Sequence, residues 1–165
     1  MAITIRMNGL DRHSVRNAIN QLKEIRVGFN DKMNDVCERL ATIGAYRASA
    51  EFSRSEYVGN NDVKVYADQF VDYWEVRASG ESVLFMEYGA GAKRGYGHPQ
   101  PNGYGPGTYP GKGHWDDPKG WYLPKEVFGV RGIHCFGNRP TMAMYLAEQD
   151  MRAELDNVVS EVFGQ

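Results

Sequence analysis

SVRNAINQLKEIRVGFNDKMNDVCERLATIGAYRASA, residues 14–50, carries apolar side chains at intervals of three or four positions. This interval is typical of one face of a helix, and that face would hold Val15, Ile19, Leu22, Phe29, Met33, Val36, Leu40 and Ile43. Gly28 and Asn30 flank Phe29, a composition at which a helix can break. Unbroken, about 37 residues would extend roughly 55 Å, which is longer than a compact domain of this size is wide. We therefore expect either a helix pair that folds back at Gly28 or one long helix that leans on a neighbouring chain.

A short strand and a turn are expected ahead of this helix. Residues 2–7, AITIRM, alternate apolar and polar side chains, with Ile3, Ile5 and Met7 on one face. The NGLD that follows would turn the chain, and Asp11 or Ser14 would cap the helix.

The segments after the helix predict a small antiparallel sheet. Residues 60–67 and 70–89 contain the alternating apolar and polar positions that are typical of strands. Ser79-Gly80 lies inside the second segment and suits a hairpin turn.

A C-terminal helix is predicted from residues 137–163, GNRPTMAMYLAEQDMRAELDNVVSEVF, with Pro140 at its first helical position. Its apolar stripe would hold Met144, Met151, Leu155, Val158 and Val162, widened by Val159 and Phe163. Its outer face would be acidic, with Glu148, Asp150, Glu154, Asp156 and Glu161.

Residues 89–139 differ in composition from the rest of the chain. All seven prolines lie between Pro99 and Pro140, and glycines and aromatic residues are dense. At most one short hairpin, around residues 126–136, is expected here, and a loop of this length is either functional or disordered. We predict one α+β domain over residues 1–165: an N-terminal long helix or helix pair, a small antiparallel sheet, this Gly/Pro/aromatic loop as an insertion or arm, and the C-terminal helix.

Composition excludes several classes of protein. The chain has 165 residues, a formal net charge of −2 and a sequence pI of about 6.1, so bulk charge gives no general attraction to nucleic acid. Cys37 and Cys135 stand far apart, without a CxxC motif, as expected of reduced thiols. No apolar run approaches the ~20 residues of a membrane helix, and the N-terminus lacks a signal-peptide core. We expect a soluble protein with no membrane partner, made in the cytoplasm.

No catalytic or cofactor motif stands out. A metal-dependent hydrolase could use His98, His114, Asp116 and His134, with Asp117 and Cys135 nearby, but no pair has the spacing of a metal site on a regular element. Gly89, Gly91 and Gly95 are spaced as in a phosphate-binding loop, but YGHPQPNGYGPG cannot supply the helix that such a loop needs. There is also no GxSxG elbow. We expect no enzymatic activity, no cofactor and no bound metal.

The aromatic residues of the loop leave three interpretations open. Rings on a glycine-rich backbone suit protein contacts, or a module that stacks on glycans or single-stranded DNA. They could also pack back on the sheet. The residues in question are Tyr96, Tyr104, Tyr109, Trp115, Trp121 and Tyr122.

Four segments in this order resemble the tail-completion or neck-protein family of tailed bacteriophages. They are ITIRMNGLDRHSVRNAINQL (residues 3–22), LFMEYGAGAK (84–93), GTYPGKGHWDDPKGWYLP (107–124) and GNRPTMAMYLAEQDMRAELDNVVSEVF (137–163). Residues 51–60, EFSRSEYVGN, depart from the turn that the family has after its first helix.

The resemblance implies a structural virion component at the neck or proximal tail, assembled in the host bacterial cytoplasm. It implies a homo-oligomeric ring of sixfold or twelvefold symmetry that completes the tail or joins it to the head. Its neighbours would be neck, tail-terminator or tail-tube proteins, and genomic DNA would pass without sequence-specific contact.

Two sets of residues carry this expectation. Glu87, Tyr88, Gly89 and Gly91 would form the family motif and shape the turn out of the sheet, with positive φ at the glycines and Glu87 bonded to nearby backbone amides. The expected anchors at the subunit interface are Tyr96, Tyr104, Tyr109, Trp115 and Trp121.

Overall fold

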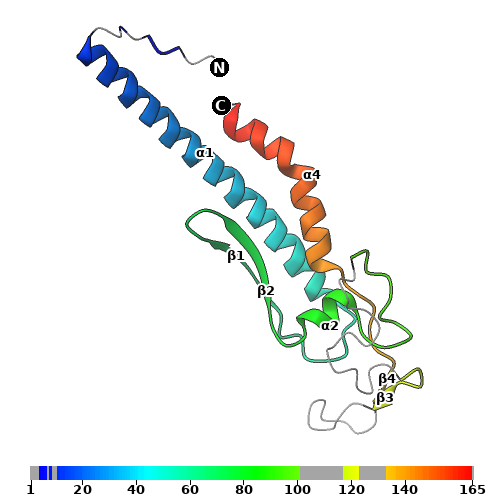
Figure 1. Ribbon diagram of the computed structural model, residues 1–165. Helices are drawn as coiled ribbons and strands as arrows, with labels where there is room; N and C mark the ends of the chain where they lie inside the picture. Colours follow the sequence, from blue (N-terminus) through cyan, green and yellow to red (C-terminus); the bar gives the residue numbers. More distant parts are fainter. Residues whose placement is uncertain (1–3, 7, 9–10, 101–116, 123–132, 165) are drawn as a thin grey trace.

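The computed structural model describes residues 4–6, 8, 11–100, 117–122 and 133–164. These residues form the predicted α+β arrangement, with a long first helix, a small antiparallel sheet and a terminal helix (Figure 1). In chain order the elements are α1 (Arg12–Ser53), β1 (Lys64–Gln69), β2 (Trp74–Ser79), α2 (Val83–Tyr88), β3 (Trp121–Tyr122), β4 (His134–Cys135) and α4 (Ala143–Phe163).

Helix α1 is a single unbroken helix of 42 residues. Asp11 caps it as predicted, because its carboxylate accepts hydrogen bonds from the backbone N–H groups of His13 and Ser14 at 3.0 and 3.3 Å. The helix continues through Gly28, so the helix-pair alternative is wrong. At about 1.5 Å per residue it extends roughly 63 Å.

Helix α4 lies along the C-terminal half of α1 and forms the core with it (Figure 1). Small residues allow a close approach: a Cβ on Gly44 would lie 2.6 Å from the sulfur of Met151. One buried cluster joins Ala48, Phe52, Met86, Ala143 and Ala147, and a second joins Val36, Val158 and Val162. Near the end of α4, the ring of Phe163 lies 5.6 Å from that of Phe29, so α1 continues beyond its partner.

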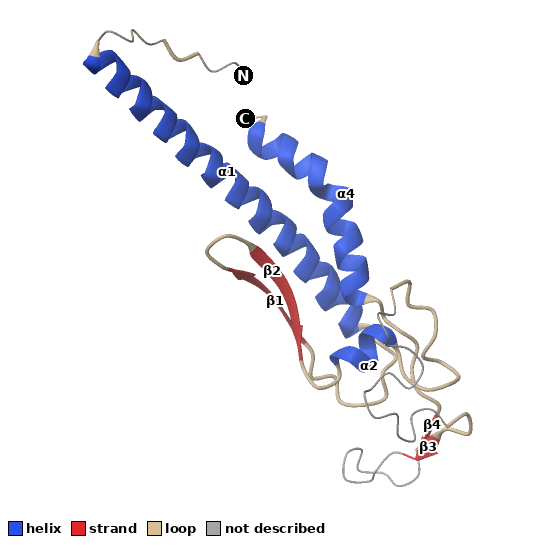
Figure 2. Cartoon of the chain, viewed as in Figure 1, coloured by secondary structure: helices blue, strands red, loops and turns tan. Residues whose placement is uncertain are grey.

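The β1–β2 hairpin packs on α1 along a different side from α4 (Figure 2). Lys64 pairs with Ser79 at one end and Gln69 with Trp74 at the other. Asn34 of α1 holds this second end, because its side-chain oxygen accepts hydrogen bonds from the side chains of Gln69 and Trp74, both at 3.0 Å.

Two predictions about this region are wrong. The hairpin turn lies between Phe70 and Tyr73, where the N–H of Phe70 donates to the carbonyl of Tyr73 at 2.9 Å. Ser79-Gly80 leads instead into α2, so residues 83–88 are helical rather than part of a strand. Asp62 favours this helix because its carboxylate accepts hydrogen bonds from the N–H of Glu81 at 2.6 Å, and from the N–H and hydroxyl of Ser82.

The start of the last helix also differs from the prediction. Helix α4 begins at Ala143 rather than at Pro140, because Met142 has left-handed backbone angles (φ 56°, ψ 30°) that interrupt any helix before it. The N–H of Thr141 instead donates to the carbonyl of Met86 at 2.8 Å, which ties the approach to α4 onto α2.

Three further expectations concern the N-terminal strand, the hairpin of the long loop and membrane-spanning helices. Residues 4–6 carry no strand, and the rest of the predicted N-terminal strand lies outside the described residues. His134–Cys135 pairs with Trp121–Tyr122, upstream of the expected hairpin, most of which also lies outside. None of the helices in the described part of the chain is long and apolar enough to cross a membrane.

Candidate functional site

Glu87 joins the end of α2 to the start of α4. One carboxylate oxygen accepts a hydrogen bond from the N–H of Met144 at 2.8 Å, and the other accepts from the N–H of Tyr145 at 3.1 Å. Met142 precedes the helix and cannot cap it, so a residue distant in sequence supplies the acceptor that a helix N-terminus needs. The negative charge also lies where the helix dipole favours it.

His98 contacts the same carboxylate, at the oxygen that accepts from Tyr145. Its Nε2 lies 3.1 Å from a Glu87 oxygen, and its Nδ1 accepts a hydrogen bond from the N–H of Gln100 at 3.0 Å. Because Nδ1 acts as an acceptor, Nε2 carries the proton and donates to Glu87. Tyr88 and Tyr145 hold the imidazole between them, with ring centroids at 4.5 and 5.8 Å. The start of the long loop is thus fixed to both α2 and α4.

Backbone contacts complete this region, which we call the Glu87 junction: residues 85–91, His98 and residues 138–145. The side-chain amide of Asn138 donates to the carbonyl of Phe85 at 2.8 Å, and its backbone exchanges two hydrogen bonds with Ala90. The carbonyl of Met86 accepts from both the N–H and the hydroxyl of Thr141. Asn138 and Thr141 could not be predicted from the sequence, since their partners are about fifty residues away.

Gly89 and Gly91 let the chain turn out of α2, not out of the sheet as expected. Their φ angles are +78° and +84°, a region that favours glycine. A Cβ on Gly89 would lie 2.8 Å from the nitrogen of Pro140, so a larger residue would also collide with the opposite strand of the junction.

Glu87 and His98 are acid–base groups of the junction, but their polar atoms already form hydrogen bonds within the chain. The side chains of Glu87 and His98 are 5% and 6% exposed, and their polar atoms bond within the chain. Among the described residues, no group of three or more His, Cys, Asp or Glu could hold a metal ion. Of the other hydrolase candidates, His134 stacks on Tyr122 at 4.7 Å, whereas His114 and Asp116 lie outside the described residues.

The expected interface rings fall into two groups. Tyr104, Tyr109 and Trp115 lie outside the described residues. Tyr96 is 63% exposed, whereas Trp121 is only 8% exposed. The ring of Trp121 therefore packs inside the chain and offers no free face to a neighbouring subunit, so Tyr96 is the described member that fits the expected role.

A second surface is the part of α1 that continues past α4, residues 12–28, which we call the projecting half of α1 (Figure 1). Ala18 is its only buried residue among those described. Among the described residues, the apolar stripe that packs against α4 from Val36 onward continues here without such cover: Ile19 is 46% and Leu22 55% exposed.

A basic stripe runs beside these apolar residues. It consists of Arg12, Arg16, Lys23 and Arg26, whose spacing places them on one side of the helix. With Glu24 as its only carboxylate, the projecting half carries a formal net charge of +3. None of the four basic side chains forms an ion pair with a described residue.

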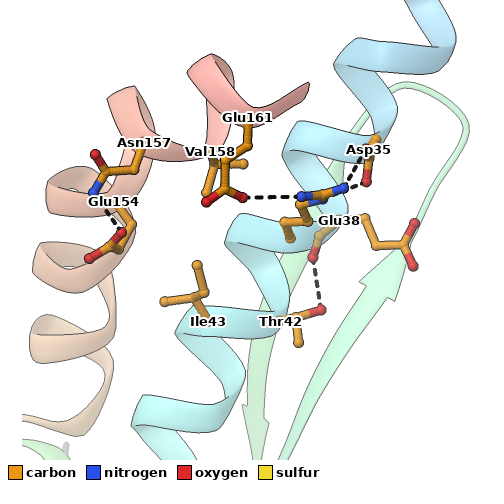
Figure 3. A pocket seen from close by; sticks show the side chains of 9 residues that line it. Asp35, Glu38, Thr42, Ile43, Glu154, Asn157, Val158 and Glu161 are labelled. Atoms are coloured by element: carbon orange, nitrogen blue, oxygen red, sulfur yellow. Dashed lines mark hydrogen bonds and ion pairs between the residues drawn. The ribbon is translucent and has the colours of Figure 1, made fainter. Parts of the chain in front are cut away.

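A groove of about 480 Å³ lies between α1 and α4 (Figure 3). Arg39 crosses it, pairing with Asp35 at 2.8 Å and with Glu161 at 3.3 Å, and the hydrogen bond to Asp35 raises the pKa of this guanidinium. The groove is lined by Asp35, Glu38, Arg39, Thr42, Ile43, Glu154, Asn157, Val158 and Glu161, a formal net charge of −3.

Two of the five acids predicted for the outer face of the last helix contact α1 instead. Glu161 pairs with Arg39, and Asp150 pairs with Arg47 at 3.2 Å. The pattern of charges indicated a solvated face, because sequence spacing alone does not show where a second helix lies. The groove was consequently not predicted from the sequence.

Comparison of the chain with protein-family models, curated proteins and solved structures found no match. The resemblance to phage neck and tail-completion proteins therefore stays a prediction. The exposed and charged surfaces of the described residues are the physical basis for assigning a role.

Proposed function

We propose that this chain is a structural component of a tailed bacteriophage virion. It completes the tail or joins it to the head as one subunit of a homo-oligomeric ring around the DNA channel, and it has no catalytic activity of its own. The observation that carries the proposal is the projecting half of α1, whose apolar stripe lies open beyond the chain's own core.

Packing of an amphipathic face supplies most of the stability of a helix in a protein. Within the chain, the projecting half has little packing of this kind against described residues. Its exposed apolar side chains include Ile19, Leu22 and Val27. Covering two of them would contribute roughly 1 kcal/mol or more each. Exposed apolar surface of this kind marks sites of protein contact.

The charge of the chain is compatible with a position beside passing DNA. Its formal net charge is −2, and α4 and the groove are acidic, so most of the described surface does not attract phosphate. Four segments of the chain follow the order of the phage family, and the acid–base groups Glu87 and His98 are already hydrogen-bonded within the chain. Both points favour an assembly component over the hydrolase and over the glycan- or DNA-binding module.

Light scattering on the purified protein over a range of concentrations tests the proposal. We expect a discrete oligomer, or a monomer that becomes one when a portal-connector or tail-tube protein is added. Replacing Ile19 and Leu22 together by Ser should weaken this assembly at least about tenfold, since each loses ~1 kcal/mol of apolar contact.

Asn17→Ser is the control, because this exposed residue lies on the face of the same helix opposite Ile19 and Leu22 and should leave assembly unchanged. A wild-type protein that stays monomeric at every concentration, with and without such partners, would contradict the proposed function.

A further inference from the structure

The chemistry of the projecting half of α1 limits which surfaces can bind it. Its surface combines open apolar residues with four basic side chains that have no ion-pair partner among the described residues. A suitable cover must bury Leu22 and its neighbours and also bring carboxylates toward the basic stripe.

A second copy of the chain offers two kinds of cover. Two projecting halves could pack against each other, but this would bring +3 against +3. Like charges across an interface are destabilising. The groove between α1 and α4 carries −3 instead, and its lining includes the apolar side chains of Ile43 and Val158.

Two carboxylates of the groove are available for such a contact. Asp35 and Glu161 already pair with Arg39, whereas Glu38 and Glu154 form no ion pair with a described residue. Both are exposed, and Glu154 bonds only to the side chain of Asn157. An amphipathic helix in a groove is a recurrent mode of protein recognition.

We propose that the projecting half of α1 in one copy packs along the α1–α4 groove of a second copy, with its basic stripe facing Glu38 and Glu154. This inference rests on the proposed function and specifies its subunit contact. The two surfaces occupy different parts of each chain, residues 12–28 and residues 35–43 with 154–161, so every copy can give one contact and receive another. Such a head-to-tail contact closes into a ring when the rotation between copies allows it.

Two double variants reverse the charge on one surface at a time. Arg16→Glu with Lys23→Glu changes the basic stripe, and Glu38→Lys with Glu154→Lys changes the groove while leaving the Arg39 pairs in place. The matched controls make the same charge changes at exposed residues away from both surfaces: Lys64→Glu with Arg94→Glu, and Glu56→Lys with Asp72→Lys. Circular dichroism and thermal melting verify that each variant folds.

Sedimentation velocity then measures self-association, alone or with the neighbouring phage protein if assembly requires it. We expect each double variant to raise the dissociation constant at least about tenfold, and the controls to leave it nearly unchanged. An equimolar mixture of the two double variants should recover assembly, because each reversed surface then meets a reversed partner. Added salt should weaken the wild-type contact.

Different failures point to different errors. If the stripe variant loses assembly but the groove variant keeps it, the contact lies elsewhere and this inference is wrong, while the proposed function stands. If the stripe variant only loses retention on duplex DNA, the stripe binds nucleic acid and the inference is again wrong. If the wild-type protein never assembles under any of these conditions, both the proposed function and this inference are wrong.

Discussion

At the Glu87 junction, the side chains of Glu87, His98 and Asn138 form hydrogen bonds to other parts of the same chain. Along the projecting half of α1, four basic side chains have no ion-pair partner among the described residues, and the apolar stripe is open. The junction depends on contacts within one chain, whereas the projecting half makes few such contacts with the described residues outside its own helix. The difference separates the residues that stabilise the fold from those available for assembly.

Removal of the carboxylate at the junction should have the largest effect on stability. Glu87→Ala leaves the N–H groups of Met144 and Tyr145 and the imidazole of His98 without their acceptor in a buried place. We expect the free energy of unfolding to fall by about 3 kcal/mol, measured by urea denaturation. The control Glu81→Ala, at an exposed carboxylate, should cost under about 0.5 kcal/mol. Similar losses for the two variants would show that the junction adds little.

A glycine-to-alanine change at the junction should have the next largest effect on stability. Gly89→Ala meets both a positive φ and the nitrogen of Pro140, so we expect a loss of about 2 kcal/mol in the free energy of unfolding. A thermal melt within experimental error of the wild type would mean that the chain accepts a Cβ here and that the two strands of the junction are not closely packed.

Asp62, beside the junction, should make stability depend on pH. The Ser82 hydroxyl, followed by the N–H groups of Glu81 and Ser82, holds the pKa of this carboxyl below its ordinary value. Its contribution is therefore complete above the ordinary carboxyl pKa and is lost as pH falls through the lower folded-state pKa. We expect Asp62→Ala to cost about 1 kcal/mol near neutral pH. The difference from wild type should shrink in acid, as measured by urea midpoints across pH; a constant difference would contradict the linkage.

The smallest effect has the opposite sign and lies in the projecting half. Gly28→Ala adds a methyl group that meets nothing within 4 Å, at a helical position where glycine is costly. We expect the local helix to gain up to about 1 kcal/mol, seen as slower amide hydrogen exchange over residues 20–30. Unchanged or faster exchange there would contradict this expectation, because it would mean that the added methyl group does not stabilise the helix. The same glycine-to-alanine substitution is thus expected to lower stability at Gly89 in the junction and to raise it at Gly28 in the projecting half.

Regular patterns predicted the parts of the fold that depend on local sequence. The apolar stripe predicted α1, and Asp11 predicted its start, because both signals act within a few residues. The alternatives at Gly28 stayed open, since the same residue is tolerated in a helix or ends one.

Contacts between distant residues explain the errors. The apolar run at residues 83–88 fits a strand or a buried helix equally, and Asp62, about twenty residues earlier, decides between them. Pro140 looked like a helix start, but Glu87 supplies the cap for a helix that begins at Ala143. The role of Glu87 as an acceptor for backbone amides was expected, whereas its partners in α4 could not be read from sequence.

Because α1 is one continuous helix, its N-terminal half has a fixed rotational orientation relative to its C-terminal half. Its C-terminal half is locked by α4 and the hairpin, so the direction in which Leu22 and the basic stripe face is set by the number of residues between them and Val36. One deleted residue in that interval would rotate the whole outer surface by about 100°, whereas removing about seven, close to two turns, would preserve its direction and shorten its reach by roughly 10 Å. The number of residues between Leu22 and Val36 is therefore constrained, in addition to the side chains in this interval that form contacts of their own.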